Sequence, residues 1–127
     1  MRKIEVVAAI IRKDNKIFCA QRNLAKSMGG KWEFPGGKIE EGETNEEALV
    51  REIREELDSE IKVDNYFMTI EHDYPTFHIT MHTYLCTLIN GKLTLNEHND
   101  SVWLYKEELN KLDWADADMP IINKIME

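Results

Sequence analysis

Gly37 to Glu56 reads GKIEEGETNEEALVREIREE, and this stretch carries the most informative pattern of the 127-residue chain. It starts with glycines that follow Pro35, passes through acidic turn residues, and ends in a predicted helix. Glu52, Glu55 and Glu56 are spaced i, i+3 and i+4, so a helix places them along one stripe where like charges repel. Such a stripe is either a solvated surface or a cation site, and magnesium is usually held by a few carboxylates plus substrate phosphates. The segment therefore predicts metal-dependent chemistry on a phosphorylated substrate.

The start of this helix is predicted by Thr44, which is followed three residues later by Glu47 in the spacing of a capping box. The apolar positions of the helix form a stripe of their own, made by Leu49, Val50, Ile53 and Leu57. This stripe is centred about a third of a turn from the carboxylates. The helix can therefore pack on a sheet while it presents its acids to a cleft.

Most of the remaining chain is strand-like. Ile4 to Ile11 is almost continuously apolar and β-branched, which is typical of a strand covered on both faces. Further extended segments are expected at residues 17–22, 31–34, 61–72, 77–89 and 101–105. Asn90-Gly91 predicts a hairpin that joins the strand ending at residue 89 to another strand at residues 92–96.

Two further helices are expected, at residues 106–112 and 116–126, and Pro120 requires a place in the first turn of the second one. Strands outnumber helices and are interrupted by one long central helix. This order favours a mixed sheet between helical layers, an α/β or α+β fold, in a single domain spanning residues 1–127.

Bulk composition restricts the partners. The formal net charge is −8, which argues against a nucleic-acid polymer, because such binding draws on basic contacts to phosphate. The start of the chain lacks a signal-peptide core, and no apolar run approaches the ~20 residues needed to span a bilayer. Cys19 and Cys86 lie in apolar runs without C-x-x-C spacing and are expected as buried free thiols. A cytoplasmic protein, either a monomer or a homodimer, is the expectation.

The joint spacing of the acidic segment resembles the signature of Nudix hydrolases, G-x5-E-x7-R-E-U-x-E-E-x-G-U, where U is aliphatic. The matching residues are Gly37, Glu43, Arg51, Glu52, Ile53, Glu55 and Glu56. The chain departs from the signature at Asp58, where glycine is usual, and at Ser59, where an aliphatic residue is usual. Aspartate tolerates the left-handed conformation of a helix end, so the helix can still end there.

The resemblance implies the Nudix fold and a magnesium ion, with manganese as the alternative. By analogy with the family, Glu52, Glu55 and Glu56 hold the metal together with the carbonyl oxygen of Gly36. Glu97 lies at the place where related proteins carry a further acidic ligand. The alternative for Glu97 is an ordinary acid in a polar loop.

The resemblance also assigns the catalytic roles. Arg51 and Glu43 form an ion pair that braces the loop against the helix and so positions Glu52. Glu52 is expected to orient or deprotonate the attacking water. Hydrolysis of a diphosphate requires in-line attack on phosphorus, with cations neutralising the developing oxyanion charge.

The resemblance covers nearly the whole chain and is nearest to the MutT-like branch, in particular the CTP pyrophosphohydrolase and 8-oxo-dGTP diphosphatase subgroup. It implies hydrolysis of nucleoside triphosphates to monophosphate and pyrophosphate, in the manner of enzymes that sanitise the nucleotide pool and protect DNA. The expected substrates are oxidised or modified nucleotides such as 8-oxo-dGTP, or cytosine nucleotides. The alternatives are a hydrolase of nucleotide sugars or dinucleotides, and a catalytically silent nucleotide-binding sensor.

Base recognition in this branch falls near the start of the last helix, at Asp118. An ionised Asp118 only accepts hydrogen bonds, which favours cytosine N4 or the guanine N1/N2 edge, unless it is simply an acid at a helix start. Phe34 and Tyr74 are expected either to stack on the base or to lie in the core. Arg22 either contacts the base or sugar or is a solvated strand-end residue, and Lys38 is placed with the substrate-binding residues. The four histidines at positions 72, 78, 82 and 98 are expected in structural or surface roles.

Overall fold

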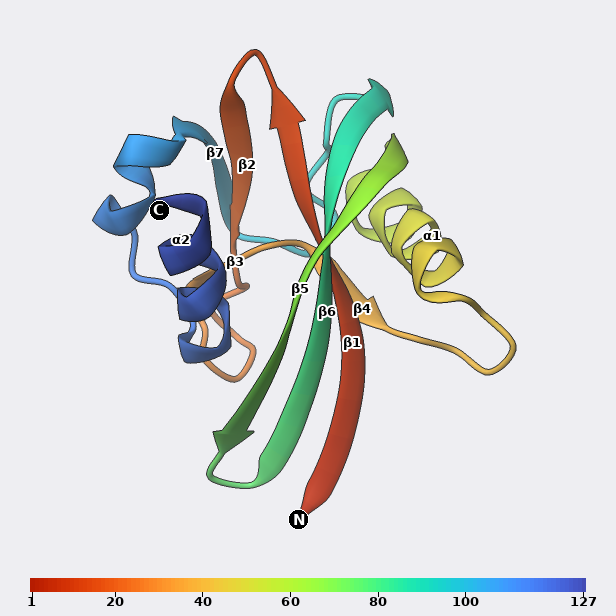
Figure 1. Cartoon of the computed structure of the whole chain (residues 1–127), viewed down its shortest axis with the longest axis vertical. Helices are drawn as coiled ribbons and strands as arrows, with labels where there is room; N and C mark the ends of the chain where they lie inside the picture. Colours follow the sequence, from red (N-terminus) through yellow and green to blue (C-terminus); the bar gives the residue numbers. More distant parts are fainter.

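The computed structural model describes residues 1–127 and contains a seven-stranded mixed sheet with helices on both of its faces (Figure 1). This confirms the expected α/β architecture. The strands are β1 (Arg2–Lys13), β2 (Lys16–Gln21), β3 (Trp32–Glu33), β4 (Gly36–Lys38), β5 (Glu60–Tyr74), β6 (Phe77–Asn90) and β7 (Asp100–Tyr105). The α-helices are α1 (Asn45–Leu57) and α2 (Met119–Ile125), and two 3-10 segments are η1 (Lys106–Lys111) and η2 (Asp116–Asp118).

Strand β1 lies at the centre of the sheet, as its continuous apolar run predicts. It pairs in parallel with β6 along almost its whole length, with Ile10 opposite Leu85. Its other edge pairs antiparallel with β4 near the start and with β2 at the end. The sheet order is β3-β2-β1-β6-β5, and β7 pairs with β2. Because both edges and both faces of β1 are covered, residues Val7 to Ile11 are all buried.

The alternation of side chains along β1 divides the core into two layers. Val7, Ala9 and Ile11 face α1 and pack in a cluster with Leu49, Ile53 and Leu57 of that helix. The opposite face, which carries Ala8 and Ile10, is covered by α2 and the segment before it, in a cluster that includes Trp114, Ile121 and Ile122. Figure 1 shows α1 on one side of the sheet and α2 on the other. The acidic helix and the C-terminal helix therefore lie on different faces.

The predicted capping box of α1 is present. The Glu47 backbone N–H donates to Thr44 Oγ1 at 3.1 Å, and the Thr44 N–H donates to Glu47 Oε1 at 2.9 Å. Two of the backbone donors that a helix start leaves without partners are thereby satisfied.

Helix α1 ends at Asp58 and Ser59, the two positions where the sequence departs from the Nudix signature. Asp58 adopts the left-handed conformation, with φ 48° and ψ 44°, and its N–H reaches the Arg54 carbonyl. Ser59 is buried, where it donates to the Leu57 carbonyl at 2.9 Å and accepts the Leu93 N–H at 2.8 Å. A hydroxyl replaces the usual aliphatic residue here because it joins the helix end to a neighbouring loop.

The predicted strand at residues 92–96 is wrong. Both edges of β6 are already occupied, by β1 and β5, so no edge is free for a further strand. Residues 92–96 instead run past the end of α1, where Thr94 N–H donates to the Leu57 carbonyl at 2.8 Å and Asn96 N–H to the Glu56 carbonyl at 3.1 Å. These bonds satisfy carbonyls that a helix C-terminus leaves without partners.

The C-terminal region also differs in detail from the expectation. Residues 106–111 form a 3-10 segment, and the closing helix is preceded by a 3-10 turn at residues 116–118. Pro120 lies in the first turn of α2, as its missing N–H requires. No helix is long and apolar enough to cross a membrane.

The two cysteines are free and buried, as predicted. Burial raises the pKa of the Cys19 thiol and that of the Cys86 thiol to about 12. Both side chains therefore behave as small core residues.

Candidate active site

Strand β4 holds the glycine turn between β1 and α1. Gly36 pairs with Ala8 and Gly37 with Val7. A Cβ atom on Gly36 would collide with the Val7 carbonyl oxygen, and one on Gly37 would collide with the Glu52 carboxylate. Gly36 is therefore required by the Val7 backbone, whereas a side chain at Gly37 would displace the Glu52 carboxylate. The Glu52 carboxylate consequently lies directly against the backbone of the loop.

Arg51 connects this loop to the helix. Its guanidinium donates to both oxygens of Glu43, from Nε at 2.7 Å and from NH2 at 2.9 Å, and to the Lys38 carbonyl at 3.0 Å. NH1 reaches Glu52 Oε1 at 3.0 Å and Glu55 Oε2 at 3.2 Å. Hydrogen bonding to Arg51 holds the pKa of the Glu43 carboxyl below its ordinary value. Arg51 therefore fixes both the loop and the orientation of Glu52.

Glu56 and Glu97, two acidic residues near Glu52, form no ion pair with a basic residue. Burial raises the pKa of Glu56 to about 9, and a hydrogen bond with Glu97 and the charges of Glu52 and Glu97 act in the same direction. Burial also raises the pKa of Glu52, although its bond to Arg51 opposes the shift. The Oε1 atom of Glu56 is buried without any hydrogen-bond partner. The loop at residues 92–96 carries Glu97 to this place because it is bonded to the last turn of α1.

These residues fit a divalent cation. An orphaned carboxylate oxygen and two neighbouring carboxyls with raised pKa values form an environment in which a cation allows the acids to ionise together. Glu52, Glu56 and Glu97 line one cavity, although no group of three or more acidic, histidine or cysteine side chains is gathered closely enough to hold a metal ion. Glu55 lies apart, because its side chain is 60% exposed and paired with Arg51.

A cavity of about 990 Å³ joins the acid cluster to the residues expected to bind the base. Nine of the twelve expected site residues line it, namely Arg22, Phe34, Gly36, Lys38, Glu52, Glu56, Tyr74, Glu97 and Asp118. The other three, Glu43, Arg51 and Glu55, lie outside the lining. The structure therefore brings together residues from both ends of the chain.

Asp118 is a buried acid in the wall of this cavity. Its side chain accepts the Phe34 backbone N–H at 3.0 Å through Oδ2 and makes no capping bond to α2. Burial raises its pKa to about 8, although the bond from Phe34 opposes the shift. This shift favours the protonated carboxyl, which can donate as well as accept a hydrogen bond, over the ionised carboxylate considered from the sequence.

The two expected aromatic residues serve the core and the cavity together. Phe34 stacks on Trp114 with ring centroids 4.9 Å apart and an interplanar angle of 29°. The Tyr74 hydroxyl accepts the Ala117 N–H at 2.9 Å. Both rings are almost fully buried and still line the cavity. Each ring therefore belongs to the core and also lines the cavity in which a base would bind, so the two alternatives left open by the sequence do not exclude each other.

The sequence did not indicate two polar residues of the cavity, Glu33 and His98. Arg22 donates to Glu33 Oε1 at 2.9 Å, and His98 Nε2 lies 3.1 Å from Glu33 Oε2. Burial alone would raise the pKa of Glu33, but His98 and Arg22 hold it below its ordinary value. The His98 side chain is only 4% exposed, and its Nδ1 atom has no partner. The sequence signal that could have found them is their position beside expected site residues, since Glu33 precedes Phe34 and His98 follows Glu97.

The remaining histidines do not line the cavity. His78 lies between Asp73, at 2.6 Å, and Glu71, at 3.2 Å, and His82 contacts Glu5 at 2.7 Å. His72 packs against the ring of Tyr74. These three therefore have the structural or surface roles expected of them.

Residues 6–124 match the model of the NUDIX domain. The chain belongs to the Nudix family. It is 40% identical over 126 residues to the CTP pyrophosphohydrolase of Escherichia coli K12, covering 99% of this chain and 93% of that protein. It is 36% identical to the 8-oxo-dGTP diphosphatase of the same organism, covering 98% of each.

Solved structures agree with this assignment. The solution structure of the E. coli ORF135 protein shares 40% identity and a TM-score of 0.84, covering 99% of this chain and 90% of that one. A MutT protein of the Nudix hydrolase family from methicillin-resistant Staphylococcus aureus 252 shares 50% identity and a TM-score of 0.79, covering 99% and 98%. The protein is thus a Nudix hydrolase of the MutT type.

Proposed function

We propose that this Nudix hydrolase cleaves nucleoside triphosphates to monophosphate and pyrophosphate with a divalent cation, and that it removes cytosine nucleotides or oxidised nucleotides such as 8-oxo-dGTP from the pool. The observation that carries the proposal is the single cavity that joins the acidic residues Glu52, Glu56 and Glu97 to the buried Asp118. The acidic residues can hold the cation that a triphosphate requires, and Asp118 can form hydrogen bonds with the base. The names of the two E. coli relatives support this substrate class.

Glu52, Glu56 and Glu97 would hold the cation, magnesium or manganese, with the Gly36 carbonyl nearby. When bound, the ion neutralises phosphate oxygens and lowers the pKa of water. Without it, burial and the neighbouring Glu97 raise the pKa of Glu56 and so favour its protonated form. Cation binding and proton binding at Glu56 therefore compete.

Glu52 is our assignment for the base that accepts a proton from the attacking water. Arg51 holds Glu52 Oε1 from one side, and the Gly37 backbone lies against the carboxylate. This fixes the carboxylate before substrate arrives, and its raised pKa makes it a better proton acceptor than an exposed glutamate. Water attacks phosphorus and the bond to the bridging oxygen breaks, leaving nucleoside monophosphate and pyrophosphate.

Asp118 is our assignment for base selection. With Oδ2 occupied by the Phe34 N–H, its second oxygen is available to a ligand. Protonated Asp118 donates to an acceptor such as cytosine N3, while ionised Asp118 accepts from an amino group or a ring N–H. The same carboxyl therefore distinguishes bases in different ways on the two sides of its pKa.

The experiment is a panel of CTP, dCTP, 8-oxo-dGTP, the normal nucleotides and a nucleotide sugar, with separation of pyrophosphate from phosphate. Fastest release of pyrophosphate from a cytosine or oxidised nucleotide is the expected result. Fastest cleavage of the nucleotide sugar, or release of phosphate, would overturn the substrate class.

The Glu52→Gln variant tests the catalytic assignment. We expect it to lose pyrophosphate release at saturating magnesium while it keeps the circular dichroism spectrum of the wild type. Turnover near the wild-type rate would remove Glu52 from the mechanism. Tight nucleotide binding by the wild-type protein without any turnover would instead indicate a sensor.

A further inference from the structure

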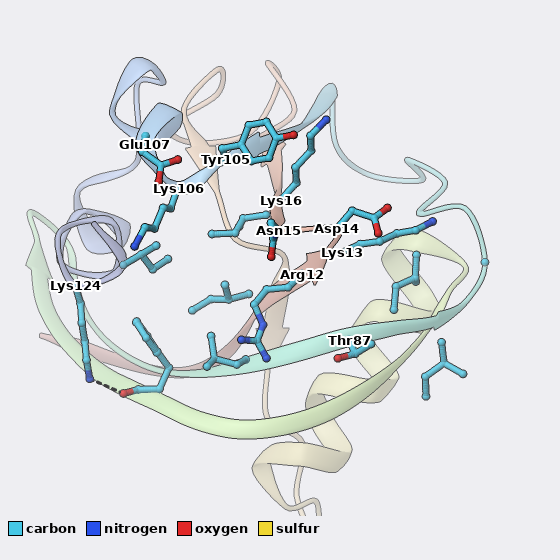
Figure 2. A pocket seen from close by; sticks show the side chains of 18 of the residues that line it. Arg12, Lys13, Asp14, Asn15, Lys16, Thr87, Tyr105, Lys106, Glu107 and Lys124 are labelled. Atoms are coloured by element: carbon cyan, nitrogen blue, oxygen red, sulfur yellow. Dashed lines mark hydrogen bonds between the residues drawn. The ribbon is translucent and has the colours of Figure 1, made fainter. Parts of the chain in front are cut away.

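A second cavity, of about 1170 Å³, lies between the β1–β2 hairpin, the end of β6, η1 and the end of α2 (Figure 2). It shares no lining residue with the nucleotide cavity. Strand β1 contributes Val6 and Ala8 to the nucleotide cavity and Ile10 and Arg12 to the second one. The two cavities therefore lie at opposite ends of the same sheet face, and the second has no part in the proposed hydrolysis.

The floor of the second cavity is apolar. Ile10 and Ile17 belong to the buried core cluster beneath it, and Phe67, Leu85 and Ile125 pack against that cluster. At the mouth, Ile89 is 64% exposed and Tyr105 is 46% exposed, although both are large apolar side chains. Covering this surface would remove apolar area from water, which favours a ligand with an apolar part.

The rim of the cavity is basic in a chain whose net charge is −8. Five cationic residues line it, Arg12, Lys13, Lys16, Lys106 and Lys124, against two acidic ones, Asp14 and Glu107. None of the four lysines forms an ion pair, and Lys124 is bonded to the Phe67 carbonyl. Positive charge collected around one cavity of an acidic protein attracts anions and raises their local concentration.

Arg12 and Lys106 are the cations best placed for such a ligand. Figure 2 shows Arg12 over the floor of the cavity and Lys106 at the side where η1 and α2 lie, whereas Lys13 and Lys16 extend outward at its edge. Arg12 has one contact, to Asp64 at 3.6 Å, which is too long for a hydrogen bond. Its donors, like those of Lys106, are therefore available to an incoming anion.

We propose that this cavity binds an amphipathic organic anion, with its phosphate or carboxylate on Arg12 and Lys106 and its apolar part on the floor. Inorganic phosphate would leave the floor in water, and a neutral apolar molecule would not use the cations. The volume is slightly above the ~300–1,000 Å³ typical of small-molecule sites, so a small organic molecule would fill most but not all of it. The shared chemistry is that of a phosphate monoester or a fatty acid with a short alkyl chain.

Titration of the 15N-labelled full-length chain with octyl phosphate and with octanoate, followed by amide chemical shifts, tests the proposal. We expect saturable shifts at Ile10, Ile17 and Tyr105 with at least one probe, and the tighter probe identifies the head group. Binding should weaken between about 20 mM and about 300 mM NaCl, because salt screens exposed charges.

The double variant Arg12→Gln/Lys106→Gln should weaken binding about tenfold, the sum expected for two partly exposed ion pairs. Both residues are exposed, so the spectrum of the free variant should keep the dispersion of the wild type. Lys92→Gln is the matched control, an exposed lysine outside the cavity, and should bind like the wild type. Nucleotide hydrolysis should be unchanged in both the double variant and the Lys92→Gln control.

Three results would overturn the proposal. The first is an absence of saturable shifts with either probe, or shifts centred on Phe34 and Asp118 in the nucleotide cavity. The second is equal affinity of the double variant and the wild type. The third is equal binding of octanol, because the site would then recognise the alkyl chain alone.

Discussion

Replacing Glu56 with glutamine should stabilise the metal-free protein, and the gain should grow with pH. Glu56 is largely buried, its Oε1 atom has no partner, and its pKa is raised from 4.5 to about 9. The folded state therefore retains a proton that the unfolded state has already lost. Folding stability contributed at this position is highest below pH 4.5 and falls as the pH rises toward 9. Glutamine has the same shape and does not titrate.

The magnitude follows from the shift. One pKa unit corresponds to about 1.4 kcal/mol, so the wild-type protein loses up to about 2.7 kcal/mol between pH 6 and pH 8 through this one group. Water entering the open cavity and movement of Glu97 reduce the penalty. We therefore expect Glu56→Gln to gain about 1–2.5 kcal/mol on the wild type over this interval.

Urea denaturation in EDTA at about pH 6, 7 and 8 measures this difference. Glu46→Gln is the matched control, since Glu46 lies exposed in the first turn of α1 without an ion pair, and its effect should stay within about 0.5 kcal/mol at every pH. Magnesium should stabilise the wild type more than Glu56→Gln. The reasoning is refuted if the advantage of Glu56→Gln is the same at pH 6 and pH 8, or if the variant is the less stable protein.

Three further substitutions test the loop, the helix end and the base site. Gly37→Ala should lower kcat by about 100-fold or more at a nearly unchanged melting temperature, because the added methyl group displaces the Glu52 carboxylate; wild-type kcat would contradict this. Asp58→Gly should raise the free energy of unfolding by about 1 kcal/mol, because glycine adopts positive φ without strain, and a lower urea midpoint would count against it. Asp118→Asn should change the relative kcat/KM among bases by about 1–3 kcal/mol and remove its variation between pH 7 and pH 9, since asparagine has no proton to lose near pH 8; an unchanged pH profile would argue against base contact.

Local patterns predicted most of the fold. The capping box of Thr44 and Glu47, the left-handed end of α1 at Asp58 and the long strands all depend on neighbouring residues, and the structure has them. The strand at residues 92–96 could not be excluded in this way. Asn90-Gly91 is a good turn, but a hairpin also needs a free edge on β6, and that edge is occupied by β5. Edge occupancy is a property of the whole sheet.

The candidate site was likewise predictable only where it depends on residues close together in the sequence. The spacing of the acidic segment was enough to bring Glu52 and Glu56 together on the helix. The partners of Glu33 could not be predicted, because Arg22 and His98 reach it from separate parts of the chain. The raised pKa of Asp118 could not be predicted from the sequence either, because it results from burial in the folded protein. Sequence spacing thus predicts which groups are present, while burial decides their charge.

The parallel pairing of β1 with β6 also sets an order of events during synthesis. Strand β1 leaves the ribosome well before β6, so its longest contact cannot form until β6, which ends at Asn90, has been synthesised. Helix α1, with its acids, is complete long before then, yet a 13-residue helix is only marginally stable in isolation. The nascent chain should therefore fold late and nearly at once, at the slow rate typical of contacts between distant residues.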